Sequence, residues 1–284
     1  MLPIFNLFSN YEQFNHLYAP RYFEWVKDGS GCIDFFVDDY IKIHDKCSSN
    51  KNPKVAMLIE PRTIQPKIYD WIEQHYDEFD AVFTHDDDLL LKLDNAEQIY
   101  FMNWYKTYNV PKTKAISMVC SDKAMCEEHK LRKKLADKLS NKVDHYGVYK
   151  GGRRCSYYEC RAEYMFEVVV DNNWFGYWIS EKFMNPLASK TIPIYKGAMK
   201  GYIPDWVDKD GIIIVDNIDD IPGIVDEILK DPEGEYKKRL EAVEKNYLTV
   251  TTNPALQVFE NWLWSEYEGL LEDLVNGEFK RSIK

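Results

Sequence analysis

The stretch "YMFEVVVDNNWFGYWISEK", residues 164–182, decides the fold class of this chain. Its first seven residues form an apolar run, which is typical of a strand buried on both faces of a parallel sheet. A polar and aromatic loop follows, and Ser180 with Glu181 then supplies the residue types of a helix N-cap and first turn. The stretch predicts a strand, a loop and a helix, in the order that builds α/β domains.

The same order recurs on both sides of this stretch. Towards the N-terminus, residues 55–59 and 80–85 have the apolar runs of strands, and residues 66–79 between them have helical spacing. Closer to residues 164–182, strands are predicted at 115–121 before them and at 191–197 and 211–216 after them, and a helix at 127–139. A chain of 284 residues is long enough for two cores. We therefore expect two α/β domains.

The segment 103–114, "NWYKTYNVPKTK", combines a proline with polar side chains and is the candidate linker. It divides the chain into an N-terminal α/β domain at 1–110 and a second at 111–255. Residues 256–284 form a third segment, predicted to be a C-terminal helix. The spacing of one amphipathic helix is found in the stretch 253–275, "NPALQVFENWLWSEYEGLLEDLV". We expect this helix to pack back across the domain junction, and ligands to bind at the carboxyl ends of strands in a cleft between the domains.

The charge of the chain argues against one class of partner. A net charge of −11 would repel a polyanion, so a general nucleic-acid-binding protein is not expected. Between Lys123 and Arg154, however, ten lysines or arginines stand against four acids. This segment is either a solvated helix face followed by a loop, or a basic patch for a small phosphate ligand, to which Arg132, Arg153 and Arg154 would contribute.

Cysteine spacing and apolar runs bear on the compartment. The six cysteines contain no C-x-x-C pair, so reduced thiols are expected instead of a zinc site or a disulfide framework. The first residues lack the basic and apolar regions of a signal peptide, and no run of about 20 apolar residues predicts a membrane span. We therefore expect a cytoplasmic protein without a transmembrane segment.

Two predicted strand ends carry candidate functional groups. Glu60 is either a surface acid paired with Arg62 or, in a partly desolvated cleft, a base that takes a proton from a hydroxyl. In the second half, the first-turn amides of the helix that begins at Ser180 and the ammonium group of Lys182 favour an anionic group such as a phosphate. Glu181 beside them suits hydroxyl groups, such as those of a ribose.

Other motifs are less specific. The loop aromatic residues Trp174, Phe175, Tyr177 and Trp178 either stack on a base or sugar or fill a domain interface. The acids at 86–88 suggest a D-x-D motif that holds a nucleotide diphosphate through a metal ion, but a helix N-terminus is the favoured interpretation. The chain has no phosphate-binding loop, dinucleotide fingerprint, H-E-x-x-H or G-x-S-x-G motif. We predict no metal site.

Taken together, these residues resemble glycosyltransferase family 10, the α-1,3/α-1,4-fucosyltransferases, and in particular its bacterial and viral soluble members. The family pattern is F-x-x-x-F-E-N, a variable stretch, Y-x-T-E-K and a later a-x-P-[IV]-x-x-G. Laid on this chain, Asn172, Glu181 and Lys182 match, whereas Asp171, Trp178 and Ser180 stand where the family has Glu, Tyr and Thr. Upstream, Arg132 stands at the arginine of the family's helix, and Glu60 at its proposed catalytic glutamate.

The resemblance implies a GT-B fold, in which two Rossmann-like domains face each other across a cleft and the N-terminal one binds the acceptor. It implies an inverting, metal-independent transfer from GDP-fucose to a hydroxyl of a glycan acceptor. Glu60 would deprotonate that hydroxyl, and Arg132 and Lys182 would stabilise the departing diphosphate. Glu181 would hold the ribose, and the donor site would be completed by Asp171, Asn172 and Trp178.

The three residues that differ from the family pattern lie in the predicted donor loop, so the identity of the donor sugar is left open. L-fucose is the first expectation, and another nucleotide sugar such as UDP-xylose is the alternative, because a bulkier aromatic residue at Trp178 changes which sugar fits. A catalytically idle nucleotide- or glycan-binding protein of the same fold is a further alternative. No cofactor is expected beyond the nucleotide-sugar co-substrate, and the expected site of action is the cytosol of a bacterium or of a virus-infected host.

Overall fold

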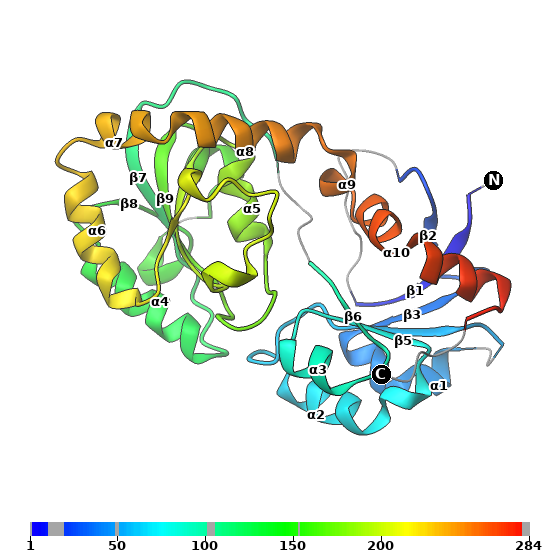
Figure 1. The fold of residues 1–284 in the computed structure, drawn as a ribbon. Helices are drawn as coiled ribbons and strands as arrows, with labels where there is room; N and C mark the ends of the chain where they lie inside the picture. Colours follow the sequence, from blue (N-terminus) through cyan, green and yellow to red (C-terminus); the bar gives the residue numbers. More distant parts are fainter. Residues whose placement is uncertain (1, 11–19, 49–50, 101–105, 153, 280–284) are drawn as a thin grey trace. The chain divides into compact units, whose positions relative to one another are not determined.

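The computed structural model describes residues 2–10, 20–48, 51–100, 106–152 and 154–279, and its ribbon is drawn in Figure 1. The chain forms two compact units. Unit 1 comprises Met1–Asn103, Phe175–Trp178 and Pro254–Lys284, and unit 2 comprises Trp104–Trp174 and Ile179–Asn253. Residues 103–105 of the predicted linker and Arg153 of the predicted basic loop lie outside the described residues.

In the described part of unit 1, six parallel strands form a sheet in the order β2-β1-β3-β4-β5-β6. The strands are β1 (Ile4–Phe8), β2 (Glu24–Val26), β3 (Asp34–Val37), β4 (Lys54–Met57), β5 (Ala81–Thr84) and β6 (Ala96–Gln98). The helices are α1 (His44–Cys47), α2 (Pro66–His75), α3 (Asp87–Lys92), α9 (Pro254–Gln257) and α10 (Phe259–Asn276), with the short 3-10 helices η1 (Asp38–Ile43) and η2 (Tyr76–Glu78). Helices α2 and α3 lie on one side of this sheet and α10 on the other (Figure 1), which explains why β3 and β5 are buried throughout.

The described residues of unit 2 contain a second parallel sheet, with five strands in the order β11-β10-β9-β7-β8. These are β7 (Lys114–Val119), β8 (Asp144–Tyr146), β9 (Tyr164–Val170), β10 (Ile192–Lys196) and β11 (Ile213–Ile214). The longer helices are α4 (Glu127–Lys138), α5 (Glu181–Leu187), α6 (Ile221–Ile228), α7 (Pro232–Lys238) and α8 (Leu240–Thr252). Phe166 and Ile194 of the central strands pack with Leu135 and Val225 into one core. The predicted α/β class with two parallel sheets is confirmed.

The prediction of one continuous helix at the end of the chain is wrong in its first turns. The stretch begins as α9, passes through Val258 with extended backbone angles (φ −134°, ψ 115°) and starts again as α10. The carbonyl of Val258 accepts the amide of Trp262 at 3.1 Å, so Val258 serves as the N-cap of the new helix. Helix α10 also departs from helical geometry at Tyr267, whose ring packs on Phe83 with a centroid distance of 4.9 Å. Contacts inside unit 1 thus override the periodic pattern.

Two further predictions about the whole chain can be compared with the structure. All six cysteines are free thiols, as their spacing indicated. Within the described ranges, none of the helices combines the length and the apolar character that a membrane crossing requires.

Candidate functional site

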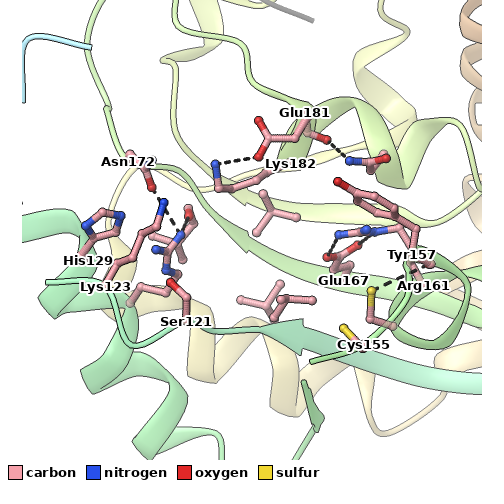
Figure 2. A pocket seen from close by; sticks show the side chains of 17 residues that line it. Ser121, Lys123, His129, Cys155, Tyr157, Arg161, Glu167, Asn172, Glu181 and Lys182 are labelled. Carbon is pink, nitrogen blue, oxygen red and sulfur yellow. Dashed lines mark hydrogen bonds and ion pairs between the residues drawn. The ribbon is translucent and has the colours of Figure 1, made fainter. Parts of the chain in front are cut away.

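A cavity of about 370 Å³ lies at the carboxyl ends of β7 and β9 in unit 2. These two strands are neighbours at the position where the strand order of the sheet reverses, the usual place for a ligand in an open α/β sheet. Ser121 after β7 and Asn172 after β9 line the cavity, and α4 and α5 contribute Arg132, Glu181 and Lys182. Figure 2 shows Asn172, Glu181 and Lys182 around it. Four of the predicted donor-site residues are therefore brought together.

Helix α4 directs one of its basic side chains into the cavity and leaves others in solvent. Arg132 is 5% exposed, and its Nη1 donates to the carbonyl of Val170 at 3.0 Å and to Oδ1 of Asn172 at 3.5 Å. Its Nε is buried without a hydrogen-bond partner among the described residues. Lys130 instead pairs with Glu127 on the exposed face. Lys130 thus fits the interpretation of a solvated helix face, whereas Arg132 lies at the cavity, where phosphate binding stays a prediction.

One turn before Arg132, His129 presents a second donor that the sequence analysis did not single out. Its Nδ1 lies 3.2 Å from the amide of Met125 and accepts that hydrogen, so the neutral ring carries its proton on Nε2. This Nε2 is buried and has no hydrogen-bond partner within the described residues. Burial, the charge of Arg132 and the nearby lysines lower the pKa of His129 to about 4. At neutral pH the ring is therefore an uncharged donor beside Asn172 and Lys123 (Figure 2).

The start of α5 is fixed by Asp171. Ser180 is the N-cap, as predicted, and its hydroxyl accepts the amide of Lys182 at 3.2 Å. The same hydroxyl lies 2.8 and 2.9 Å from the carboxylate oxygens of Asp171, to which it donates. Tyr195 donates to that carboxylate at 3.3 Å, and Asp171 is only 1% exposed. Asp171 thus joins the strand end to the helix start and is not among the residues that line the cavity.

The amide of Lys182 is consequently not available to a phosphate, contrary to the expectation that the first-turn amides would all converge on the ligand. The ammonium group of Lys182 has a different environment, 3.1 Å from Oε1 of Glu181 and 3.5 Å from Oδ1 of Asp171. Burial alone would lower the pKa of Lys182, but the two carboxylates outweigh it and raise the pKa. Burial likewise acts to raise the pKa of Glu181, and Lys182 outweighs it and lowers the pKa. Both groups are charged at neutral pH.

The far wall of the cavity holds a buried ion pair that the sequence analysis also missed. Glu167 lies in the middle of β9, and Nε and Nη2 of Arg161 each donate to one of its carboxylate oxygens at 2.7 Å. The ring of Tyr157 stacks on the guanidinium group at 5.2 Å. A lone acid inside an apolar strand was the available signal, because such a group requires a buried cation. Beside this pair, burial raises the pKa of Cys160 to about 12, so its side chain is a neutral thiol.

Glu60 lies in unit 1, after the carboxyl end of β4, and hydrogen bonds to Asp38 and Tyr69 hold its backbone and that of Ile59. The amides of Ile59 and Glu60 donate to Asp38 at 2.9 and 3.2 Å, and the hydroxyl of Tyr69 donates to the carbonyl of Glu60 at 2.9 Å. The side chain of Glu60 is half-buried. These hydrogen bonds hold the backbone from which the side chain of Glu60 extends.

In the part of the chain that the structure describes, Arg62 forms ion pairs with Asp86 and Glu73. Nε and Nη2 of Arg62 donate to the carboxylate of Asp86 at 2.8 and 3.0 Å, and Nη1 donates to Glu73 at 3.0 Å. Asp86 also accepts the amide of Leu89 at 3.0 Å and thereby caps α3, the favoured interpretation of the acids at 86–88. The predicted pairing of Arg62 with Glu60 is not what the structure contains.

The donor-loop residues Phe175–Trp178 belong to unit 1, although β9 and α5 on either side belong to unit 2. Trp178 is buried, with its indole 4.6 Å from the ring of His85, and the amide of Tyr177 donates to the carbonyl of His85 at 2.8 Å. Gly176 has a φ of +63°, and a Cβ there would lie 2.4 Å from the same carbonyl, so only glycine fits. Trp178 packs inside unit 1 and is not among the residues that line the cavity.

The cavity lies in the part of the chain that matches a known family. Residues 110–240 match the model described as glycosyltransferase family 10 (fucosyltransferase) C-term, and this range contains all the residues that line the cavity. Residues 110–240 are thus similar to the C-terminal domain of the family 10 glycosyltransferases. No curated protein matches the sequence.

Solved structures extend the likeness to glycosyltransferases to both units. The chain is similar to an alpha1,3-fucosyltransferase, with a TM-score of 0.59 and 12% identity over 100% of this chain and 94% of the other. An alpha1,3-fucosyltransferase with GDP-fucose gives a TM-score of 0.57 at 12% identity, over 100% and 93%. A point mutant of S. aureus TarM, in complex with fondaparinux, alpha-GlcNAc-glycerol and UDP, gives a TM-score of 0.53 at 14% identity, over 86% of this chain and 55% of the other. At these identities the likeness shows a shared fold, GT-B.

Proposed function

We propose that the chain is an inverting, metal-independent fucosyltransferase, which transfers L-fucose from GDP-fucose to a hydroxyl of a glycan acceptor. The observation that carries this proposal is the set of cations and unpaired donors around the cavity of the family 10 domain. The solved relative with GDP-fucose supports the choice of donor. The family match supports the choice of reaction.

The diphosphate of the donor would bind at the end of the cavity formed by α4 and the start of α5. Arg132 offers a buried guanidinium Nε–H, His129 an uncharged Nε2–H and Lys182 an ammonium group. A leaving diphosphate gains negative charge as its bond to the sugar breaks, and fixed donors in a partly buried site stabilise that charge without reorganising. These protein groups supply the stabilisation that a divalent cation provides in other transferases.

The nucleoside would occupy the remaining cavity. The carboxylate of Glu181 is 31% exposed and remains ionised beside Lys182, so it can accept hydrogen bonds from the hydroxyls of a ribose. Asn172 lines the cavity beside Arg132, from which its Oδ1 accepts a hydrogen bond, and would orient the phosphates. Asp171, in this proposal, positions the start of α5, and Trp178 packs within unit 1.

Glu60 would act as the general base. The acceptor hydroxyl attacks the anomeric carbon from the face opposite the diphosphate and gives its proton to the carboxylate of Glu60. The bond between the anomeric carbon and the diphosphate oxygen breaks in the same step, and GDP leaves with the electron pair. This attack inverts the configuration at the anomeric carbon. The backbone hydrogen bonds around Glu60 support the assignment, because a base needs a fixed direction.

Two alternatives keep the same fold. In the first, the enzyme would use another nucleotide sugar, such as UDP-xylose, an alternative favoured by the three donor-loop departures and by the UDP in the TarM structure. The second alternative is a catalytically idle binding protein. Action in the cytosol remains a prediction from the sequence.

Calorimetric titration of the full chain with GDP, UDP and GDP-fucose, each with and without EDTA, tests these proposals. We expect GDP and GDP-fucose to bind and EDTA to leave their affinity unchanged. Binding of UDP but not GDP would overturn the fucosyl assignment. If none of the three binds, the donor site is wrongly assigned, and donor binding without turnover on any glycan acceptor would favour the idle protein.

A further inference from the structure

In unit 1, a buried histidine begins α1 and is held rigidly by its neighbours. The side chain of His44 is only 3% exposed. Its ring lies against Phe36, Phe79 and Trp71, with centroid distances of 5.8, 4.8 and 6.1 Å. These aromatic contacts restrict the orientation of the His44 ring.

The hydrogen bond at Nδ1 fixes the tautomer of His44. Nδ1 lies 2.9 Å from the backbone carbonyl of Ile41. A carbonyl oxygen can only accept, so Nδ1 carries a proton. In the neutral ring Nε2 then presents its lone pair, which is the form in which histidine binds a metal ion.

This lone pair is directed at two negatively charged groups. Nε2 lies 2.9 Å from Oδ1 of Asp45 and 3.2 Å from Oε2 of Glu78. A lone pair and two carboxylate oxygens repel one another at such distances. Lys54 offsets part of the charge, with its ammonium group 3.4 Å from Oδ1 of Asp45. It does not lie between Nε2 and the carboxylates, where the two candidates for a positive species are a second ring proton and a metal ion.

The spacing of the three atoms matches a metal-binding site. All of them lie within 4.8 Å of one another. Metal bonds of about 2.0–2.2 Å place the ligands of a tetrahedral ion about 3.3–3.6 Å apart, so a small movement of the two carboxylates suffices. Both carboxylates can move, because the side chains of Asp45 and Glu78 are 73% and 38% exposed.

Contacts around the cluster are those that accompany bound metals. The carbonyl of Ile41 orients the ring of His44, and Nδ1 of His75 lies 2.7 Å from Oε1 of Glu78 and donates to it. Such outer hydrogen bonds hold metal ligands in place and set the tautomer of a ligating histidine. The exposure of the two acids leaves an entry route and room for water as a further ligand.

We propose that His44, Asp45 and Glu78 bind one divalent transition-metal ion, with Zn²⁺ as the favoured ion and water completing the coordination. One imidazole nitrogen and two carboxylate oxygens are ligands that Zn²⁺ accepts readily. Glu78 is the last residue of η2, so the ion links α1 to η2 and stabilises unit 1. The site is separate from the donor cavity, which lies in unit 2, and takes no part in the proposed transfer.

The test titrates the full chain, first freed of metal with a chelator, with ZnCl₂ in a calorimeter. We expect one ion per chain and a higher melting temperature when Zn²⁺ is present. Glu78→Gln and Asp45→Asn, both at exposed side chains, should each weaken Zn²⁺ binding by at least about tenfold. Asp77→Asn, which neutralises the neighbouring acid of η2, is the matched control and should bind like the wild type.

Three results would overturn the proposal. One is the absence of stoichiometric binding of Zn²⁺ or Co²⁺. Another is unchanged Zn²⁺ affinity in Glu78→Gln and Asp45→Asn. A third is a nitrogen NMR spectrum of His44 that still shows both ring nitrogens protonated at neutral pH after Zn²⁺ is added, since a second proton would then occupy the position assigned to the metal. GDP affinity should be the same with and without Zn²⁺, which separates this test from that of the donor site.

Discussion

Replacing Lys182 with methionine tests the diphosphate site most directly, because it removes the ammonium group and keeps a side chain of similar length. The ammonium lies 3.1 Å from Glu181 and 3.5 Å from Asp171, and the side chain is 29% exposed. A Coulomb estimate for two unit charges 4 Å apart near a protein surface gives about 4 kcal/mol, which is an upper bound for so exposed a group. A charge-assisted hydrogen bond contributes roughly 1.5–3 kcal/mol.

We therefore expect the Kd for GDP to rise about 10- to 150-fold in Lys182→Met. The upper half of this range is favoured, since the carboxylates of Glu181 and Asp171 lose their cation and then repel the diphosphate. The affinity for guanosine, which has no phosphate, should change less than about twofold by the same reasoning. Calorimetric titration of both ligands gives both values.

Lys130→Met is the matched control, because Lys130 is on the exposed face of α4 and, among the described residues, pairs with Glu127 alone at 3.1 Å. A surface pair of this kind contributes about 1 kcal/mol or less to stability and should leave GDP binding unchanged. Thermal melting of each variant verifies that it is folded. A Kd for GDP within about threefold of the wild type, or an equal loss of guanosine affinity, would refute the reasoning that Lys182 binds the diphosphate.

Three other predictions concern catalysis, stability and pH. Glu60→Gln should lower kcat by about 10²- to 10⁴-fold and leave GDP affinity unchanged, as steady-state kinetics and calorimetry would show; full turnover would remove Glu60 as the base. Arg161→Met should lower the free energy of unfolding by about 3–5 kcal/mol in urea because it strands the carboxylate of Glu167, whereas replacing both residues with apolar ones should cost much less; equal losses would contradict this account. Burial lowers the pKa of His85 to about 4, and burial together with the charge of Arg132 lowers the pKa of His129 to about 4, both from the usual 6.5. The contribution of these neutral rings to stability is therefore complete above pH 6.5 and is lost as the pH falls towards 4. Urea unfolding between pH 7 and 4 should therefore show a smaller loss for His129→Gln than for the wild type, and parallel curves would mean that His129 is not held neutral.

Most of the proposed donor-binding residues could be picked out from sequence because they are close together along the chain. Asn172, Glu181 and Lys182 follow one buried strand and begin one helix, so a strand run and an N-cap signal were enough to place them. Arg132 was singled out by the basic excess of its segment and by the family resemblance, and the helical period placed it on α4. Local signals of this kind depend on backbone geometry over a few residues, which sequence encodes directly.

The roles of Asp171 and His129 were not accessible in this way. A carboxylate at a strand end can bind a ligand or anchor its own helix, and only the positions of Ser180 and Tyr195 assign Asp171 to the second role. His129 carries its free proton on Nε2 because the amide of Met125 lies 3.2 Å from Nδ1. The distance between two side chains depends on packing, which a linear pattern does not contain.

By itself, the sequence determined that the chain is built from alternating strands and helices with two parallel sheets, and that one strand end carries a charged loop. These features follow from apolar periodicity, which reflects how much of each face must be buried. Only the tertiary structure decided that Phe175–Trp178 packs within unit 1, that Arg161 pairs with Glu167 and that His44 faces two carboxylates. The side chains in each of these contacts come within hydrogen-bonding or van der Waals distance only when the chain between and around them has folded.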